Sequence, residues 1–193
     1  MTKDERPRTF VIPHLMNPSS SFNRSPILPE PIRAALIRLA PILNATGAPW
    51  VLGGSCSLAL HGVPVTPHDL DIATDREGAY QIGEALRKVA QEIRPVQWGE
   101  SERIRSHYGQ YRIGDVQVDV IGAAELREGD NWTPAKLPSE WEVELVAVPG
   151  ADLSVPAFTL QHELVAYRRL QREVKAQLIE EQLQSGGHAV QAR

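Results

Sequence analysis

Apolar residues recur at helical spacing near residue 30 and predict a first helix there. The helix begins at Pro31, because a proline at the first helical position loses no hydrogen bond, and Gly47 suits its end. Its apolar face consists of residues three or four positions apart, namely Ile32, Leu36, Leu39, Ile42 and Leu43. Pro41 lies inside this stretch, so we expect it to bend or break the helix.

Short apolar runs bounded by turn residues predict two strands in the following segment. Residues 49–52 form the first run and end at Gly53 and Gly54, while residues 68–74 form the second. Small apolar residues at 55–60 predict a short helix between the strands. Asp75 is a good N-cap for a longer helix that runs to about residue 94. The apolar stripe of this helix consists of Ile82, Leu86, Val89 and Ile93.

The Gly114–Asp115 dipeptide separates two apolar–polar alternating segments and predicts a β-hairpin. Its strands would span 103–113 and 116–121. Residues 122–139 carry prolines and charges and are predicted to be a loop. Two further strands are predicted at 141–148 and 153–158, and one long helix at 159–184.

This pattern predicts an α/β or α+β fold with a mixed β-sheet flanked by helices and a long C-terminal helix. The proline-rich residues 1–29 are interpreted as an extended, partly mobile arm. Residues 30–158 would form the main domain. Residues 159–193 would pack on the same domain as a helix followed by a frayed tail from Ser185.

Composition narrows the class of protein. The chain has 193 residues, of which 42% are hydrophobic and 23% charged, as expected for one soluble domain. Its formal net charge of −4 gives no overall basic field of the kind that binds nucleic acid. Cys56 is the only cysteine, which excludes an internal disulfide and a cysteine-rich zinc site and favours the cytoplasm. No apolar run approaches 18 residues, so we expect no membrane span.

The candidate chemistry begins with carboxylates on predicted strands. Asp69 and Asp71 alternate with apolar residues, so both side chains should lie on one face of their strand. Asp119 interrupts a run of valines on the second hairpin strand, against the propensity of aspartate. If the two strands are neighbours, three carboxylates converge, and such a cluster suits a divalent cation such as Mg²⁺ or Mn²⁺. Each motif taken alone could equally be a polar strand surface.

The glycines between the first strand and the short helix are a candidate phosphate site. Gly53 and Gly54 allow a ligand to approach the backbone closely, and Ser55 lies where free N–H groups point outward. An ordinary tight turn would carry the same triplet.

Basic residues could neutralise a bound triphosphate. Arg103, Arg105 and His107 alternate on the first hairpin strand and could do so. The last helix is also basic and carries Arg168 and Lys175. Solvated surfaces are the alternative interpretation of both groups. His162, near the start of that helix, is predicted to be a surface residue.

Taken together, residues 52–72, LGGSCSLALHGVPVTPHDLDI, resemble the signature of the DNA polymerase beta nucleotidyltransferase superfamily. The run from Thr66 to Ile72 is most similar to small bacterial aminoglycoside and lincosamide nucleotidyltransferases. The resemblance implies a nucleotidyltransferase fold with Asp69, Asp71 and Asp119 as metal-binding and catalytic residues, Asp119 either completing the metal site or acting as general base. It implies that Gly53, Gly54, Ser55, Arg103 and Lys175 bind the nucleotide.

The implied activity is metal-dependent transfer of a nucleoside monophosphate from a nucleoside triphosphate, such as ATP, to a hydroxyl acceptor, with release of pyrophosphate. The acceptor could be a small molecule, a protein or an RNA end, and a second copy of the chain could complete the cleft as a homodimer. Two alternatives remain: a non-catalytic nucleotide- or partner-binding module, and a toxin of a toxin–antitoxin pair that modifies tRNA.

Overall fold

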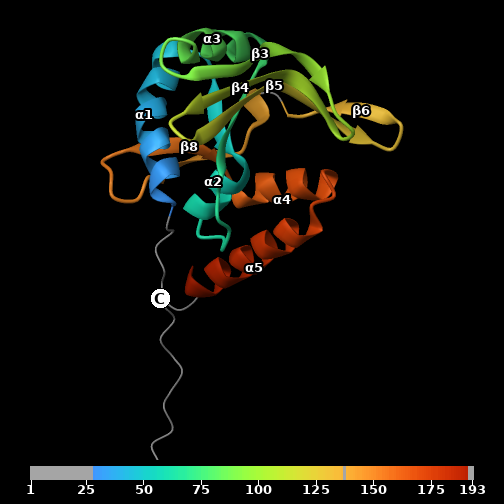
Figure 1. Ribbon diagram of the computed structural model, residues 1–193. Coiled ribbons are helices and arrows are strands. Elements are labelled where there is room, and N and C mark those ends of the chain that lie inside the picture. The colour runs from blue at the N-terminus through green and yellow to red at the C-terminus, as the bar shows by residue number, and fades with distance from the viewer. Residues whose placement is uncertain (1–27, 137, 191–193) are drawn as a thin grey trace, which may run out of the picture.

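A computed structural model describes residues 28–136 and 138–190 of the chain, and in it a single mixed sheet is flanked by helices (Figure 1). The helices are α1 (Glu30–Thr46), α2 (Gly54–Leu60), α3 (Arg76–Leu86), α4 (Leu160–Arg169) and α5 (Glu173–Val190), with a short 3₁₀ turn at Pro138–Glu140. The strands are β1 (Trp50–Gly53), β2 (Asp69–Thr74), β3 (Gln91–Glu100), β4 (Ile104–Ile113), β5 (Val116–Glu128), β6 (Asn131–Pro134), β7 (Val143–Ala147) and β8 (Ser154–Phe158). The predicted fold class is therefore confirmed. Nearly all of the predicted arm, residues 1–27, lies outside the described residues.

The strand order is β3-β4-β5-β2-β1-β8-β7, and β6 pairs with the C-terminal end of β5. The pairs β2–β5 and β1–β8 are parallel, and all other pairs are antiparallel. The parallel contact between β2 and β5 brings together two segments that are about fifty residues apart in the sequence. This contact positions the candidate site.

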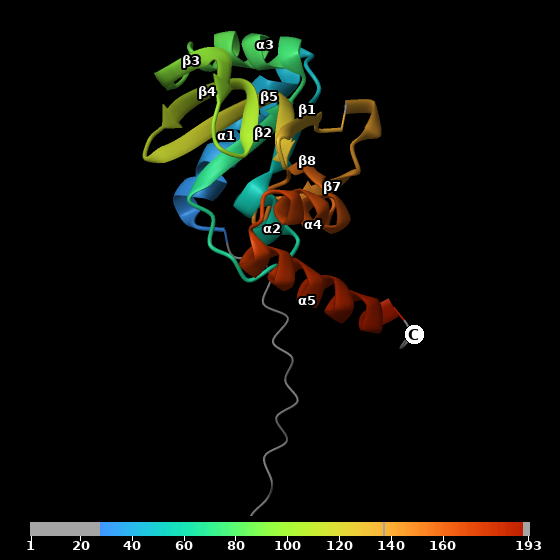
Figure 2. The same ribbon diagram turned by 90° about the vertical axis from the view of Figure 1, so that its right-hand side faces the viewer.

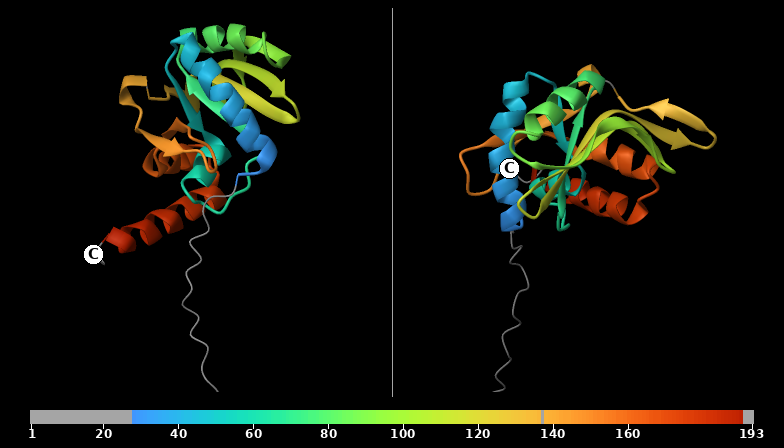
Figure 3. Two further views of the ribbon diagram at one scale, coloured as in Figure 1. Left: turned by 90° about the vertical axis from the view of Figure 1, so that its left-hand side faces the viewer. Right: turned by 45° about the horizontal axis from the view of Figure 1, so that its top comes forward.

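Helices α1 and α3 pack on one face of the sheet, and α4 and α5 lie on the other side (Figure 2). The main core lies beneath α1 and α3, where Leu36, Leu39, Leu70 and Ile72 are fully buried. A smaller second core joins α2, α4 and α5. The end of α5 projects beyond the body of the protein (Figure 3). Among the described residues, no helix is long and apolar enough to cross a membrane.

Helix α1 continues through Pro41, so of the predicted bend or break the break is wrong. Leu39 and Leu43, on either side of the proline, are both fully buried. Packing of this face offsets the backbone hydrogen bond that proline removes. The helix ends at Gly47 with φ of 73°, a left-handed conformation that glycine adopts without strain.

Helix α3 is shorter than predicted. It ends at Leu86, and residues 91–100 form the edge strand β3 rather than a continuation to about residue 94. Ile93 is therefore on an exposed strand, although its spacing from Val89 matched a helical stripe. Pairing with β4 decides the conformation of this segment, and helical spacing alone could not reveal that pairing.

The segment predicted as a loop at 122–139 contains the end of β5 and the whole of β6. Glu128 pairs with Asn131 across Gly129–Asp130, and Gly129 has φ of 62°. Ile113 pairs with Val116 across Gly114–Asp115 in the same way. Thus the same dipeptide forms both hairpins, but alternating apolar residues flank only the one at Gly114–Asp115, so the second hairpin carries the weaker sequence signal.

The predicted C-terminal helix is in fact two helices. Helix α4 ends at Arg169, Gln171 has φ of 55°, and α5 begins at Glu173. No glycine or proline marks this break, which is why helical periodicity ran through it. The chain reverses here so that α5 packs against α4. The tail expected from Ser185 is helical to Val190.

Candidate active site

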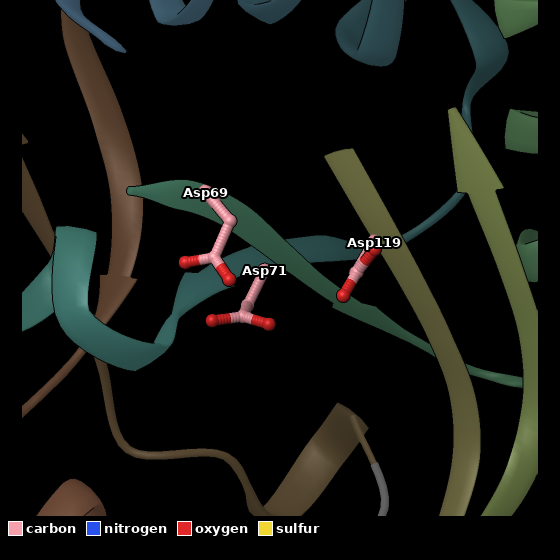
Figure 4. A group of neighbouring side chains, drawn as sticks. All are labelled: Asp69, Asp71 and Asp119. Carbon is pink, nitrogen blue, oxygen red and sulfur yellow. The ribbon is translucent and has the colours of Figure 1, made fainter. Parts of the chain in front are cut away.

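Three aspartates converge at the junction of β2 and β5. Asp71 lies directly beside Asp119 in the parallel register, and Asp69 lies beside Gln117. One carboxylate oxygen from each of Asp69, Asp71 and Asp119 lies within 4.8 Å of the other two. Figure 4 shows the three side chains pointing into the same space. The structure thus brings together the three residues that the sequence predicted as a cluster.

Strand alternation explains why these side chains face away from the main core. Leu70 and Ile72 of β2 and Val118 of β5 are fully buried beneath α1 and α3. Because successive side chains in a strand point to opposite faces, Asp71 and Asp119 must face the side of α4.

Asp71 and Asp119 are held in an environment that disfavours their negative charge. Burial, together with the charges of Asp69 and Asp119, raises the pKa of Asp71 to about 7, while Arg172 and Lys175 oppose the shift. Burial also raises the pKa of Asp119, against hydrogen bonds from Tyr108, Gln110 and Gln117. A cation between the oxygens would relieve this repulsion.

Hydrogen bonds fix the orientation of Asp119. Gln117 Nε2 donates to its Oδ1 at 3.1 Å and to its Oδ2 at 3.2 Å, and Gln110 Nε2 donates to Oδ1 at 3.3 Å. Gln110 is opposite Asp119 in the β4–β5 register. Amide donors of this kind leave oxygen lone pairs available to a further ligand.

Gly54 packs directly against the Asp71 carboxylate. Its φ is +66°, and a Cβ added to it would overlap Asp71 Oδ2. Gly53 pairs with Asp71 across β1 and β2, so the glycine turn and the carboxylates form one surface. Ser55 is buried and does not line the adjoining cavity, and its predicted contact with phosphate remains a prediction.

A cavity of about 450 Å³ opens over the carboxylates. Its wall includes Gly53, Gly54, Asp71 and Asp119, and it continues along the apolar part of β5 at Ile121. Its lining also includes His162, Glu163 and Tyr167 of α4, and Arg172 from the connection between α4 and α5. The cavity is large enough for part of a nucleotide or for a small acceptor.

Glu163 lines the cavity, although no motif in the sequence singled it out. Glu163 and Tyr167 are the two buried residues of α4 and lie one helical turn apart. Their i, i+4 spacing places them on one face of the helix, and this was the signal that could have revealed that face. Burial, followed by the charge of Asp71, raises the pKa of Glu163 to about 8. His162 was predicted to lie on the surface, but it is half-buried and stacks on Phe158 with ring centroids 4.0 Å apart.

The predicted basic residues fall into two groups. Arg103 does not line the cavity, and its Nη2 lies 3.7 Å from Oε1 of Glu102. Arg105 forms an ion pair with Glu125. Lys175 lies near the site, with Nζ 5.5 Å from the centroid of the Tyr167 ring. Arg172 contacts the same ring at 5.9 Å and also lines the cavity. The nucleotide-binding roles of Arg103 and Lys175 remain predictions.

Cys56 takes no part in this site as a nucleophile. It is fully buried, and burial together with the charges of Asp71 and Asp69 raises its pKa to about 12. A thiol with such a pKa stays protonated at neutral pH and is unreactive.

The chain is similar to known nucleotidyltransferases. The family model for aminoglycoside-2''-adenylyltransferase matches residues 35–180. Among curated proteins, no sequence matched the chain. A candidate nucleotidyltransferase from Thermotoga maritima is 30% identical, with a TM-score of 0.67 over 82% of this chain and 96% of that one.

Two antibiotic-modifying enzymes share the fold at low identity. ANT(2'')-Ia, solved with adenylyl-2''-tobramycin, is 13% identical, with a TM-score of 0.52 over 83% of this chain and 94% of that one. The lincosamide adenylyltransferase LnuA, solved with lincomycin, is 9% identical, with a TM-score of 0.51 over 79% and 97% of the two chains. The chain therefore belongs to the aminoglycoside-2''-adenylyltransferase family and is a nucleotidyltransferase.

Proposed function

We propose that this protein transfers a nucleoside monophosphate from a nucleoside triphosphate to a hydroxyl group of a small-molecule acceptor, with Mg²⁺ or Mn²⁺ as cofactor. The observation that carries the proposal is the convergence of Asp69, Asp71 and Asp119, whose oxygens lie within 4.8 Å of one another beside a cavity. Family membership supports the reaction class. A triphosphate substrate also fits the cytoplasmic setting that the lone cysteine favours.

The carboxylates suit a divalent cation. Oxygen ligands are what Mg²⁺ prefers, and it usually binds one or two carboxylates together with substrate phosphates. When bound, the cation would supply positive charge to the phosphates and offset the repulsion that raises the pKa of Asp71. The remaining steps depend on the protein's own residues.

The phosphates would lie between the glycine turn and the start of α5. Gly53 and Gly54 present backbone without side chains to the cavity. The positive charges of Arg172 and Lys175 stabilise the negative charge of Asp71. Neither residue has an ion-pair partner within 4 Å among the described residues. We infer that these two cations bind the phosphates that leave as pyrophosphate.

Besides its place in the proposed metal site, Asp119 is the residue that we assign to the acceptor hydroxyl. Gln110 and Gln117 hold its carboxylate, and burial raises its pKa, which makes it a better proton acceptor than an exposed aspartate. Asp119 would take the proton of the acceptor hydroxyl as the oxygen attacks the α-phosphorus. The bond from that phosphorus to the bridging oxygen then breaks, and pyrophosphate leaves.

Incubation of the purified protein with triphosphates labelled at the α-phosphate and with fractionated cell extract tests this proposal. We expect label in the small-molecule fraction, dependent on Mg²⁺ or Mn²⁺ and lost in Asp71→Asn. Each of the four ribonucleotides would be tried in turn. Label in the tRNA fraction would favour the toxin alternative, and nucleotide binding without transfer to any fraction would favour a non-catalytic module.

A further inference from the structure

Two neighbouring residues on α4 carry buried polar atoms that have no hydrogen-bond partner. Among the described residues, Glu163 Oε1 and His162 Nδ1 are buried and unpaired, and the Glu163 residue is only 4% exposed. Both residues line the cavity. Because buried polar atoms in proteins are nearly always hydrogen-bonded, this face of α4 is suited to the polar groups of a ligand.

Glu163 lies beside the glycine turn but is separate from the metal cluster. A Cβ added to Gly53 would lie 3.7 Å from Glu163 Oε1. The acidic group whose oxygens could share one cation consists of Asp69, Asp71 and Asp119, without Glu163. The free oxygen of Glu163 is therefore available to a hydrogen-bond donor of the substrate, close to where the proposed function places the phosphates.

In a nucleotide, the group that follows the α-phosphate is the ribose, whose 2′- and 3′-hydroxyls can each donate a hydrogen bond. A carboxyl group accepts such a bond through its free oxygen whether or not the group is ionised. Building on the proposed function, we propose that Glu163 accepts a hydrogen bond from a ribose hydroxyl of the nucleoside triphosphate and so selects ribonucleotides over deoxyribonucleotides.

Aromatic rings pack beside Glu163 on the cavity wall. The His162 ring lies parallel to Phe158 with centroids 4.0 Å apart, and Phe158 contacts Trp141 edge-on at 5.5 Å. On β5, Ile121 and Ala123 line the same cavity with side chains that form no hydrogen bond. The loss of a ribose hydroxyl would leave Glu163 Oε1 without a partner in a buried position, which is the situation that gives strong discrimination.

Titration calorimetry with ATP, 2′-deoxyATP and 3′-deoxyATP in the presence of Mg²⁺ tests the proposal without any acceptor. For the wild type, we expect one of the deoxy analogues to bind roughly 10- to 100-fold more weakly than ATP. Glu163→Met, which removes the acceptor atoms at similar side-chain length, should bind ATP as weakly as that analogue. Glu163→Gln keeps a carbonyl oxygen and should retain part of the preference.

Glu181→Gln is the matched control, since Glu181 is exposed on α5 and does not line the cavity, and it should behave as the wild type. Thermal unfolding will verify that Glu163→Met is folded. Equal binding of all three nucleotides by the wild type, or an unchanged preference in Glu163→Met, overturns the ribose proposal and leaves the proposed function standing. Failure of every nucleotide to bind with Mg²⁺ overturns both.

Discussion

Gly54 lies so close to the Asp71 carboxylate that a methyl group on its Cα would overlap Oδ2 and lie 2.9 Å from Cγ. A left-handed turn alone does not require this contact, because nothing lies within 4 Å of a Cβ built at the left-handed Gly47, Gly114 or Gly129. The close approach joins the end of β1 to the middle of β2. The glycine therefore determines where the central carboxylate of the proposed metal site can lie.

This relationship predicts that Gly54→Ala damages the site more than the fold. Gly54 and Gly114 both have positive φ, +66° and +58°, but nothing lies within 4 Å of a Cβ at Gly114. Both alanine variants should lose about 1–2 kcal/mol in the free energy of unfolding from backbone strain. Only Gly54→Ala should also displace Asp71 and reduce transfer on the order of a hundredfold. Urea denaturation and a transfer assay measure the two effects, and equal activity in both variants would contradict the prediction.

A second prediction concerns the pH dependence of stability in metal-free protein. Burial, with Asp69 and Asp119, raises the pKa of Asp71 from 3.8 to about 7. Between these values the folded state binds more protons than the unfolded state, so this group makes stability fall as pH rises from about 4 to about 7. Asp71→Asn should weaken that dependence. Melting temperatures across this range in a chelating buffer test it, and an unchanged slope in the variant would show that the shift is misassigned.

A third prediction distinguishes the roles of three cationic residues in and between the C-terminal helices. Arg172→Gln and Lys175→Gln should each weaken triphosphate binding about tenfold, because each removes a charge-assisted contact to phosphate. Arg168→Gln is the control, since Arg168 is exposed and pairs with Glu180. Calorimetric binding constants for the three variants decide the matter. A loss in Arg168→Gln equal to that in the other two would mean that only overall charge matters.

A fourth prediction tests the break between α4 and α5. Gln171 has φ of 55°, a conformation that costs a residue with a side chain about 1 kcal/mol or more. Gln171→Gly should therefore stabilise the protein by about 1 kcal/mol. Gln171→Ala should leave stability nearly unchanged, because it keeps the strain. Chemical denaturation compares the two, and a destabilised glycine variant would argue against a left-handed residue at this position.

Much of the fold follows from local patterns in the sequence. The first helix, the strands around the glycine turn and the hairpin at Gly114–Asp115 carry strong periodicity and turn signals, and each forms near its predicted place. The failures occur where distant pairing overrides local preference. Residues 91–94 continue a helical stripe but pair with β4 as a strand. The break at Gln171 carries no glycine or proline.

The candidate site shows the same division. Strand alternation predicts that Asp69 and Asp71 share a face, and an aspartate among valines singles out Asp119, so the carboxylates were recognisable from sequence. Glu163 lies on α4 and Arg172 lies in the connection between α4 and α5, and both line the cavity. Their approach to the carboxylates is a tertiary arrangement that spacing along the chain could not reveal.

Calorimetric titration of Mn²⁺ into wild type and Asp119→Asn, with a non-hydrolysable ATP analogue present, tests the central claim most directly. We predict that the wild type binds the metal and that the analogue binds only when metal is present. Asp119→Asn should lose most of the metal affinity while remaining folded. Metal binding of equal strength in the two proteins, or analogue binding that persists in a chelator, would contradict a metal site built from these three aspartates.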